Sequence, residues 1–83
     1  MKIVNSRKIL AINMKYYRHK YRLSQEKLGD LIGSSLSYIN KLENESRNPS
    51  IDMLDKISKA FKIESATLLT YNKNHIIKSK SKK

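Results

Sequence analysis

The chain has 83 residues, enough for one small domain with a modest hydrophobic core. Its 18 Lys and Arg outnumber its 7 Asp and Glu, and the net charge of +11 favours a polyanionic partner, although a merely well-hydrated surface would have the same composition. The absence of cysteine and the presence of only 2 histidines exclude a disulfide framework and a thiolate zinc site, so we expect no metal and no cofactor.

Neither a membrane span nor a secretory signal is evident. No apolar run approaches the roughly 18 residues that a membrane-spanning helix needs. Near the N-terminus, polar and basic residues interrupt the apolar ones that would form the core of a signal peptide, namely Asn5, Ser6, Arg7 and Lys8. We therefore expect a cytoplasmic protein that does not enter a membrane.

The first predicted helix covers about residues 6–21. One apolar stripe recurs at intervals of four, three and four residues and consists of Leu10, Met14, Tyr17 and Tyr21. A second, adjacent stripe consists of Ile9, Ile12 and Tyr16. Together the stripes are wider than a small domain needs, so the second is either part of a broad core, the interpretation we favour, or a surface for a partner.

Two short helices joined by a tight turn follow. Ser24 can accept hydrogen bonds from the first amides of the segment QEKLGDLI. Leu28, Leu31 and Ile32 give this segment one apolar face. Gly33 then favours the left-handed conformation with which helices often end. The segment is therefore predicted to be a helix that stops at Gly33.

The second of these helices, LSYINKLE, has different chemistry on its two sides. Ser34 or Ser35 can cap it, and its Ile39 and Leu42 point inward together. The outer side carries Leu36, Ser37, Asn40 and Lys41. Helices across so short a turn cross steeply, as in a helix-turn-helix, and small polar and basic groups on the outer side suit the major groove of DNA.

Two more helices are predicted after a loop over residues 44–49. Ser50 can cap the first, over residues 51–61, and the side chains that face the core from it are Ile51, Leu54, Ile57 and Phe61. A short helix over residues 65–69 follows.

We therefore expect an all-α fold with one domain, residues 1–71, and a basic C-terminal tail, residues 72–83. The tail is Lys-rich and free of acids, which is typical of a flexible segment that adds nonspecific phosphate affinity or only solubility. The predicted core consists of Leu10, Met14, Tyr17, Leu28, Ile32, Ile39, Leu42, Leu54, Ile57, Phe61 and Leu68.

The segment LSQEKLGDLIGSSLSYINKLENESRNPS resembles the repressor/Cro (XRE-type) helix-turn-helix family. The resemblance extends over about residues 10–69 and rests on the joint spacing of Leu23-Ser24-Gln25-Glu26, Leu28, Gly33, Ser35, Ser37-Tyr38-Ile39, Lys41, Glu43 and Arg47-Asn48-Pro49-Ser50. It implies a five-helix repressor-like bundle. It also implies a sequence-specific transcriptional regulator, a repressor, that reads the major groove of double-stranded DNA with the third helix, about residues 35–44.

The resemblance assigns roles to individual residues. The positions of the family that face the groove correspond here to Ser35, Leu36, Ser37, Asn40 and Lys41. A phosphate contact is implied for Gln25, and further candidates for phosphate contacts are Tyr38, Asn44 and Arg47. In the family an Arg late in the first helix pairs with a Glu that ends the third, so we expect a structural ion pair between Arg18 and Glu43.

Some loop positions depart from the family pattern. Glu45 replaces a frequent glycine after the third helix, so we expect another residue, such as Asn44, to take the left-handed conformation. Arg22 and Lys62 also replace common helix-ending glycines, and Ser34 lies where an apolar residue usually packs beneath the turn. Loop geometry is therefore expected to differ from that of relatives.

A single helix-turn-helix contacts few base pairs, so we expect a homodimer on a palindromic operator. The expected interface follows the core helices and consists of Leu68, Leu69, Tyr71, Ile76 and Ile77, with the second apolar stripe of the first helix in reserve.

The sequence also bears on two other classes of function, enzymes and partner-binding modules. No acid, base or nucleophile converges at a catalytic spacing, so we expect no enzymatic activity. An antitoxin, or another partner-binding module of a two-component operon that also binds its own promoter, shares this fold and implies a protein partner. A restriction-modification controller and a small phage repressor are equally compatible with the length of the chain.

Overall fold

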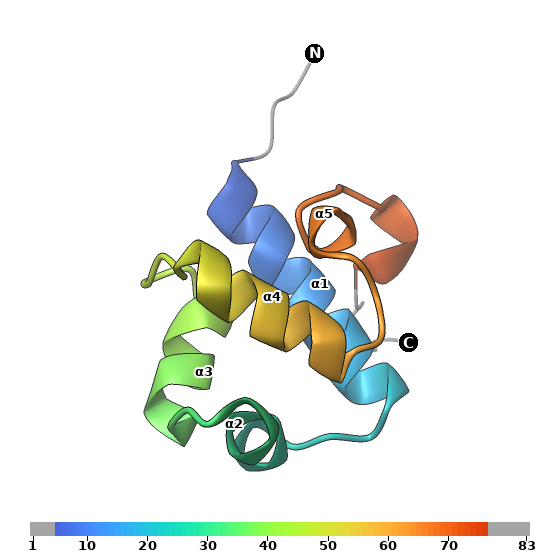
Figure 1. Cartoon of the computed structure of the whole chain (residues 1–83). Helices are drawn as coiled ribbons and strands as arrows, with labels where there is room; N and C mark the ends of the chain where they lie inside the picture. Colours follow the sequence, from blue (N-terminus) through green and yellow to red (C-terminus); the bar gives the residue numbers. More distant parts are fainter. Residues whose placement is uncertain (1–4, 77–83) are drawn as a thin grey trace, which may run out of the picture.

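The computed structural model describes residues 5–76, and within that range every regular element is helical. The elements are α1 (Ser6–Lys20), α2 (Gln25–Ile32), α3 (Leu36–Glu43), α4 (Ile51–Ala60), α5 (Ser65–Leu68) and a 3-10 helix, η1 (Lys73–His75). Helix α4 crosses in front of α1, with α2 and α3 on one side of this pair and α5 on the other (Figure 1). The predicted all-α fold of five α-helices is confirmed.

Each of the first four helices begins with a side-chain cap. The side-chain oxygens of Asn5, Ser24, Ser35 and Ser50 accept hydrogen bonds from the amides three residues later, at 2.9 or 3.0 Å. Such a cap satisfies an amide that has no partner within its helix and contributes about 1 kcal/mol. The caps predicted at Ser24 and Ser50 are confirmed, and of the two candidates for α3 the structure uses Ser35.

The same four helices also end with one shared geometry. In each, an amide donates to the carbonyl five residues earlier: Leu23 to Arg18, Ser34 to Gly29, Ser46 to Lys41 and Ile63 to Ser58, at 2.8, 2.8, 2.9 and 3.0 Å. The residue before each donor has a positive φ, and these residues are Arg22, Gly33, Glu45 and Lys62. The left-handed conformation predicted for Gly33 is therefore confirmed.

The expectation for Asn44 is wrong. Its φ is −104°, whereas Glu45 has a φ of 68° despite its side chain. The bond from the Ser46 amide to the Lys41 carbonyl fixes which residue must be left-handed. The Asn44 side chain instead accepts a hydrogen bond from the Ser46 amide at 3.1 Å, which steadies the turn from outside.

All eleven residues of the predicted core are buried, and they form one cluster. Six of them, from long and short helices alike, are fully excluded from solvent at 0% exposure: Met14, Leu28, Ile39, Ile57, Phe61 and Leu68. Burying side chains of this size stabilises a fold by roughly 1.5–3 kcal/mol each, so the core dominates the stability of the domain.

Three apolar residues that the periodicity placed inward lie at the surface instead. Leu31 is 61% exposed, Ile51 is 73% exposed and Tyr21 is 41% exposed. Ile51 is the first residue of α4 and Tyr21 follows the last residue of α1, so both stand at helix ends. Leu31 lies over a hollow between α2 and α4 that no side chain fills. By contrast, Tyr16 of the second stripe of α1 packs against the core.

The C-terminal part of the described chain docks on α1 through Asn13. The Asn13 side chain is 1% exposed, and its Nδ2 donates to the carbonyls of Thr67, Leu68 and Thr70 at 3.2, 2.7 and 3.0 Å. Its Oδ1 lies 2.8 Å from Nδ1 of His75, which is also buried. A single buried amide therefore ties α1 to α5 and to η1.

Residues 73–75 of the predicted tail instead form η1, which packs against α1. The His75 ring stacks on Tyr16 with a centroid separation of 3.8 Å, so η1 is part of the packed domain. This docking depends on a contact between residues 62 positions apart, which no local pattern reveals. Residues 77–83, the remainder of the expected tail, lie outside the described residues.

At the three non-glycine residues with positive φ, a substitution by glycine is expected to stabilise the fold. A side chain in this conformation is strained, so Lys62→Gly should raise the free energy of unfolding by about 1 kcal/mol, measured by urea denaturation. Lys62→Ala removes the same charge but retains a Cβ, so it should give no such gain. An equal gain for both variants would attribute the effect to charge instead of backbone strain.

The docked His75 predicts a pH-dependent stability. Burial, reinforced by repulsion from Lys20, holds the pKa of His75 below its ordinary value of about 6.5. The unfolded chain then binds more protons, so stability is full above about pH 6.5 and falls as the pH drops through the folded-state pKa. Urea denaturation at about pH 7.5 and 5.5 measures the free energy of unfolding that is lost on acidification. This loss should be smaller for His75→Gln than for wild type. His19→Gln, at an exposed position, should lose as much as wild type. Identical losses in all three proteins would contradict the prediction.

Candidate nucleic-acid interface

The turn between α2 and α3 is tight because Gly29 lies beneath it. A Cβ atom at Gly29 would lie 2.7 Å from the backbone oxygen of Ser34, closer than real side chains approach. Gly29 is buried in the middle of α2, where a glycine otherwise weakens a helix. Sequence reasoning passed over this residue, although an isolated glycine inside a helical pattern is a known sign of close packing.

Helix α3 presents an uncovered outer side. Ile39 and Leu42 are buried in the core, while the five residues predicted to face the groove are all exposed: Ser35, Leu36, Ser37, Asn40 and Lys41. Leu36 is 52% exposed, so a large apolar side chain stands among polar ones. The Ser35 hydroxyl accepts the capping bond from Tyr38 and still has its proton to donate. The structure therefore brings these five residues together on one accessible helix.

The four residues predicted to contact phosphates lie on or beside that helix. Gln25 is the first residue of α2, and Asn44 is the residue that caps the C-terminal end of α3. Tyr38 is half-buried, and the guanidinium of the exposed Arg47 lies over its ring at 5.4 Å from the centroid. The loop cation is therefore held close to α3 by an aromatic platform.

A buried ion pair orients α3 against α1. Arg18 Nε donates to Glu43 Oε2 at 2.7 Å, and Arg18 Nη2 donates to Glu43 Oε1 at 3.0 Å, a bidentate arrangement. Arg18 Nη1 also donates to the Leu23 carbonyl at 3.0 Å. The Arg18 and Glu43 side chains are only 13% and 3% exposed, so neither points at solvent or at a ligand. The ion pair implied by the resemblance is present in the structure.

Gln25 extends this pair towards the surface. Its Nε2 donates to Glu43 Oε1 at 3.1 Å, while its Oε1 accepts a longer, weaker bond from Asn40 Nδ2 at 3.4 Å. Asn40 Oδ1 in turn lies 3.5 Å from Asn44 Nδ2. A row of amides thus leads from the buried carboxylate to the exposed side of α3. The link from Gln25 to Glu43 was missed because it joins residues 18 positions apart.

Over residues 5–76, no helix has both the length and the apolar character required to cross a membrane. In that part of the chain, no three His, Asp or Glu side chains gather in a group that could hold a metal ion.

Comparison with known proteins places this geometry in context. The family described as Helix-turn-helix matches residues 14–68. The control protein C.SmaI of Serratia marcescens is 36% identical over 64 residues, which cover 77% of this chain and 76% of that protein. The family match spans the paired residues Arg18 and Glu43 and the whole of α2 and α3.

Two solved structures share the fold. The crystal structure of the hypothetical transcription factor NHTF from Neisseria has a TM-score of 0.77 and 27% identity, covering 80% of this chain and 76% of that one. The restriction-modification controller protein C.AhdI from Aeromonas hydrophila has a TM-score of 0.71 and 30% identity, covering 76% of this chain and 91% of that one. These relatives favour a regulator over the antitoxin interpretation.

The sequence motif, the arrangement of α2 and α3 and the relatives agree with one another. The matching family consists of DNA-binding regulators and is not a family of enzymes. The chain belongs to the XRE-type helix-turn-helix family of DNA-binding transcriptional regulators.

Proposed function

We propose that this regulator acts in the cytoplasm as a homodimeric repressor that binds a palindromic operator without catalysing any reaction. The single observation that carries the proposal is the outer side of α3, where five exposed residues are free of the core while the inner side of the same helix is locked into it. A helix fixed on one side and open on the other can enter the major groove as a rigid body.

The five residues offer complementary base-reading chemistry. Lys41 can donate to O6 and N7 of guanine, and Asn40 can pair with the edge of adenine. Leu36 can pack only on an apolar group, and the thymine methyl is the one such group in the groove. Ser35 and Ser37 donate or accept, so they discriminate weakly. The favoured half-site therefore contains guanine and thymine close together.

Phosphate contacts come from the flanks. Gln25 stands at the N-terminal end of α2, where backbone amides favour an anion, and its link to Glu43 fixes its side chain beforehand. Tyr38 of α3 and the loop residue Arg47 form a stacked pair, and Asn44 follows the last residue of α3. These four residues set the position of the domain on the duplex without reading its sequence.

Base and phosphate contacts are distinguished by two substitutions. Lys41→Ala should weaken binding to the preferred operator by about 1–3 kcal/mol and relax the preference at one base position. Gln25→Ala should weaken binding to all duplexes alike. A binding-site selection with random duplexes measures both, and Lys15→Ala, which removes an exposed cation on α1, is the control. A Lys41→Ala protein that keeps the parental preference at every position would rule out base reading by Lys41.

Burial limits which of the expected interface residues could contact a second copy of the chain. Leu68 is fully buried in the core of its own domain, so it is removed from the interface, and Ile77 lies outside the described residues. Leu69, Tyr71 and Ile76 are 40%, 47% and 44% exposed and follow one another after α5. Leu69 also borders a hollow of about 200 Å³ formed with Pro49 and Leu54, which a partner side chain could fill.

Assembly is tested by Leu69→Asp. A carboxylate at this exposed apolar position should dissociate the dimer, because a buried unpaired charge is strongly unfavourable. Sedimentation with and without a palindromic duplex measures the change, and Ile51→Asp, at another exposed apolar position, is the control. Circular dichroism checks that both variants stay folded. A 1:1 complex of the wild-type chain on a saturated palindrome would contradict the dimer itself.

A further inference from the structure

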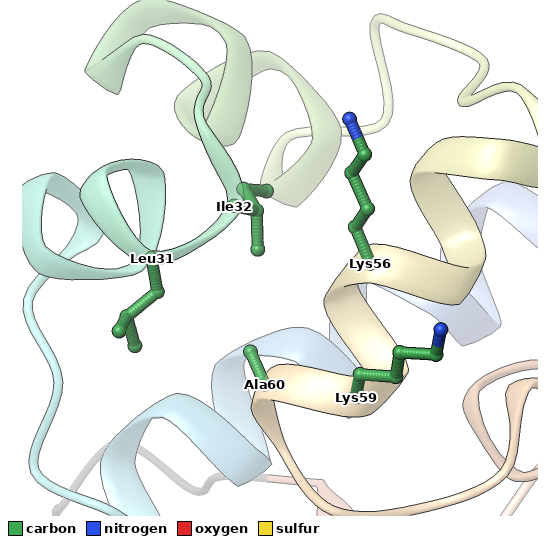
Figure 2. Close-up of a pocket in the computed structure, with 5 residues that line it drawn as sticks. All are labelled: Leu31, Ile32, Lys56, Lys59 and Ala60. Carbon is green, nitrogen blue, oxygen red and sulfur yellow. The ribbon is translucent and has the colours of Figure 1, made fainter.

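An open hollow lies between α2 and α4, outside the residues proposed to contact DNA. Its volume is about 430 Å³, and it is lined by Leu31, Ile32, Lys56, Lys59 and Ala60 (Figure 2). The space is large enough for one or two side chains of a ligand, within the usual range of small binding sites.

The hollow has an apolar floor and an exposed apolar side chain at its edge. Ile32 is 5% exposed and belongs to the core, whereas Leu31, the next residue towards the N-terminus, is 61% exposed at its edge. Scattered exposed leucines are common, but this one stands over an unfilled space. A ligand side chain that entered the hollow would cover Leu31 and gain the favourable transfer of both apolar surfaces from water.

The rim on the α4 side is cationic. Lys56 and Lys59 lie three residues apart, so they project from neighbouring turns of α4, and Figure 2 shows both ammonium groups extending from the helix. Among residues 5–76 the only ion pair is that between Arg18 and Glu43, so neither lysine is paired with a carboxylate there. The hollow therefore combines an apolar floor with two uncommitted positive charges.

We infer that this hollow binds a short segment of a protein partner in which a large apolar side chain is flanked by Asp or Glu. The apolar side chain would cover Leu31, and the carboxylates would meet Lys56 and Lys59. A nucleic acid satisfies only half of this chemistry, because its phosphates would meet the lysines and leave Leu31 uncovered. A protein segment can supply both an apolar side chain and carboxylates.

The position of the hollow permits binding of the partner and of DNA at the same time. Leu31 and Ile32 stand at the C-terminal end of α2, whereas Gln25 stands at its first residue. None of the lining residues belongs to α3. The inference goes beyond the proposed function and does not depend on it. If the chain also binds an operator, it would bring the partner segment to that operator.

A peptide selection tests the inference with the full chain. Random peptides displayed on phage are selected on the wild-type protein in the presence of excess nonspecific duplex DNA, which occupies phosphate-binding surfaces. Enriched peptides are synthesised, and their affinities are measured by fluorescence anisotropy. We expect the enriched peptides to share an apolar residue flanked by acids, and we expect Leu31→Asn to weaken their binding about tenfold, as the loss of one anchor does.

A matched pair of variants separates the hollow from overall charge. Lys56→Glu with Lys59→Glu should also weaken peptide binding about tenfold or more. Lys8→Glu with Lys15→Glu makes the same change in net charge on α1 and should leave peptide binding nearly unchanged. Thermal denaturation of each variant confirms folding, and an unchanged operator affinity of Leu31→Asn shows that DNA binding is intact.

Three outcomes would overturn the inference. The first is a selection that yields no shared apolar and acidic pattern. The second is equal weakening by the two charge variants, which would attribute peptide binding to the net charge of the chain. The third is displacement of the enriched peptides by duplex DNA, which would make the hollow a phosphate-binding surface.

Discussion

The carboxylate of Glu43 is the group on which the arrangement of the binding helices depends. It is buried at the end of α3, and a buried charge without partners is highly unfavourable. Arg18 from α1 neutralises it through two bonds, and Gln25 from α2 donates a third. Removing one partner of a buried pair typically destabilises a protein by about 3–5 kcal/mol, because the other charge is left uncompensated. Three helices are therefore held at fixed angles by one side chain.

This arrangement separates the two sides of α3. Ile39, Leu42 and Glu43 fix the helix from inside, so its outer residues can vary without disturbing the fold. Asn40 links the outer side of α3 to the buried Glu43, since its amide donates at 3.4 Å to Gln25, which in turn donates to Glu43. That bond is long enough to be exchanged for one to a base without much loss. The helix is thus rigid in position while its exposed amides keep some freedom.

The fold was predictable where local patterns determine it, and unpredictable where distant residues meet. Helical periodicity identified all eleven residues of the core cluster, from Leu10 to Leu68, because each helix buries one stripe, but it did not identify the buried Ala11. It also placed Leu31 and Ile51 inward, where only the packing of neighbouring helices could show that nothing covers them. Docking of His75 on Asn13 was missed for the same reason. The exposure of the proposed base-reading residues followed from periodicity, but the bond between Gln25 and Glu43 did not.

Few of the positively charged side chains form ion pairs within the described part of the chain. Within residues 5–76, Arg18 is the one cation paired with a carboxylate, and that pair is shielded from solvent. Two of the three strained left-handed positions, Arg22 and Lys62, also carry positive charge where glycine would be conformationally easier. Exposed cations without internal partners can replace the counterions condensed on a polyanion, and the release of those counterions favours binding. The positive surface is therefore left available for phosphates and for the carboxylates of a partner.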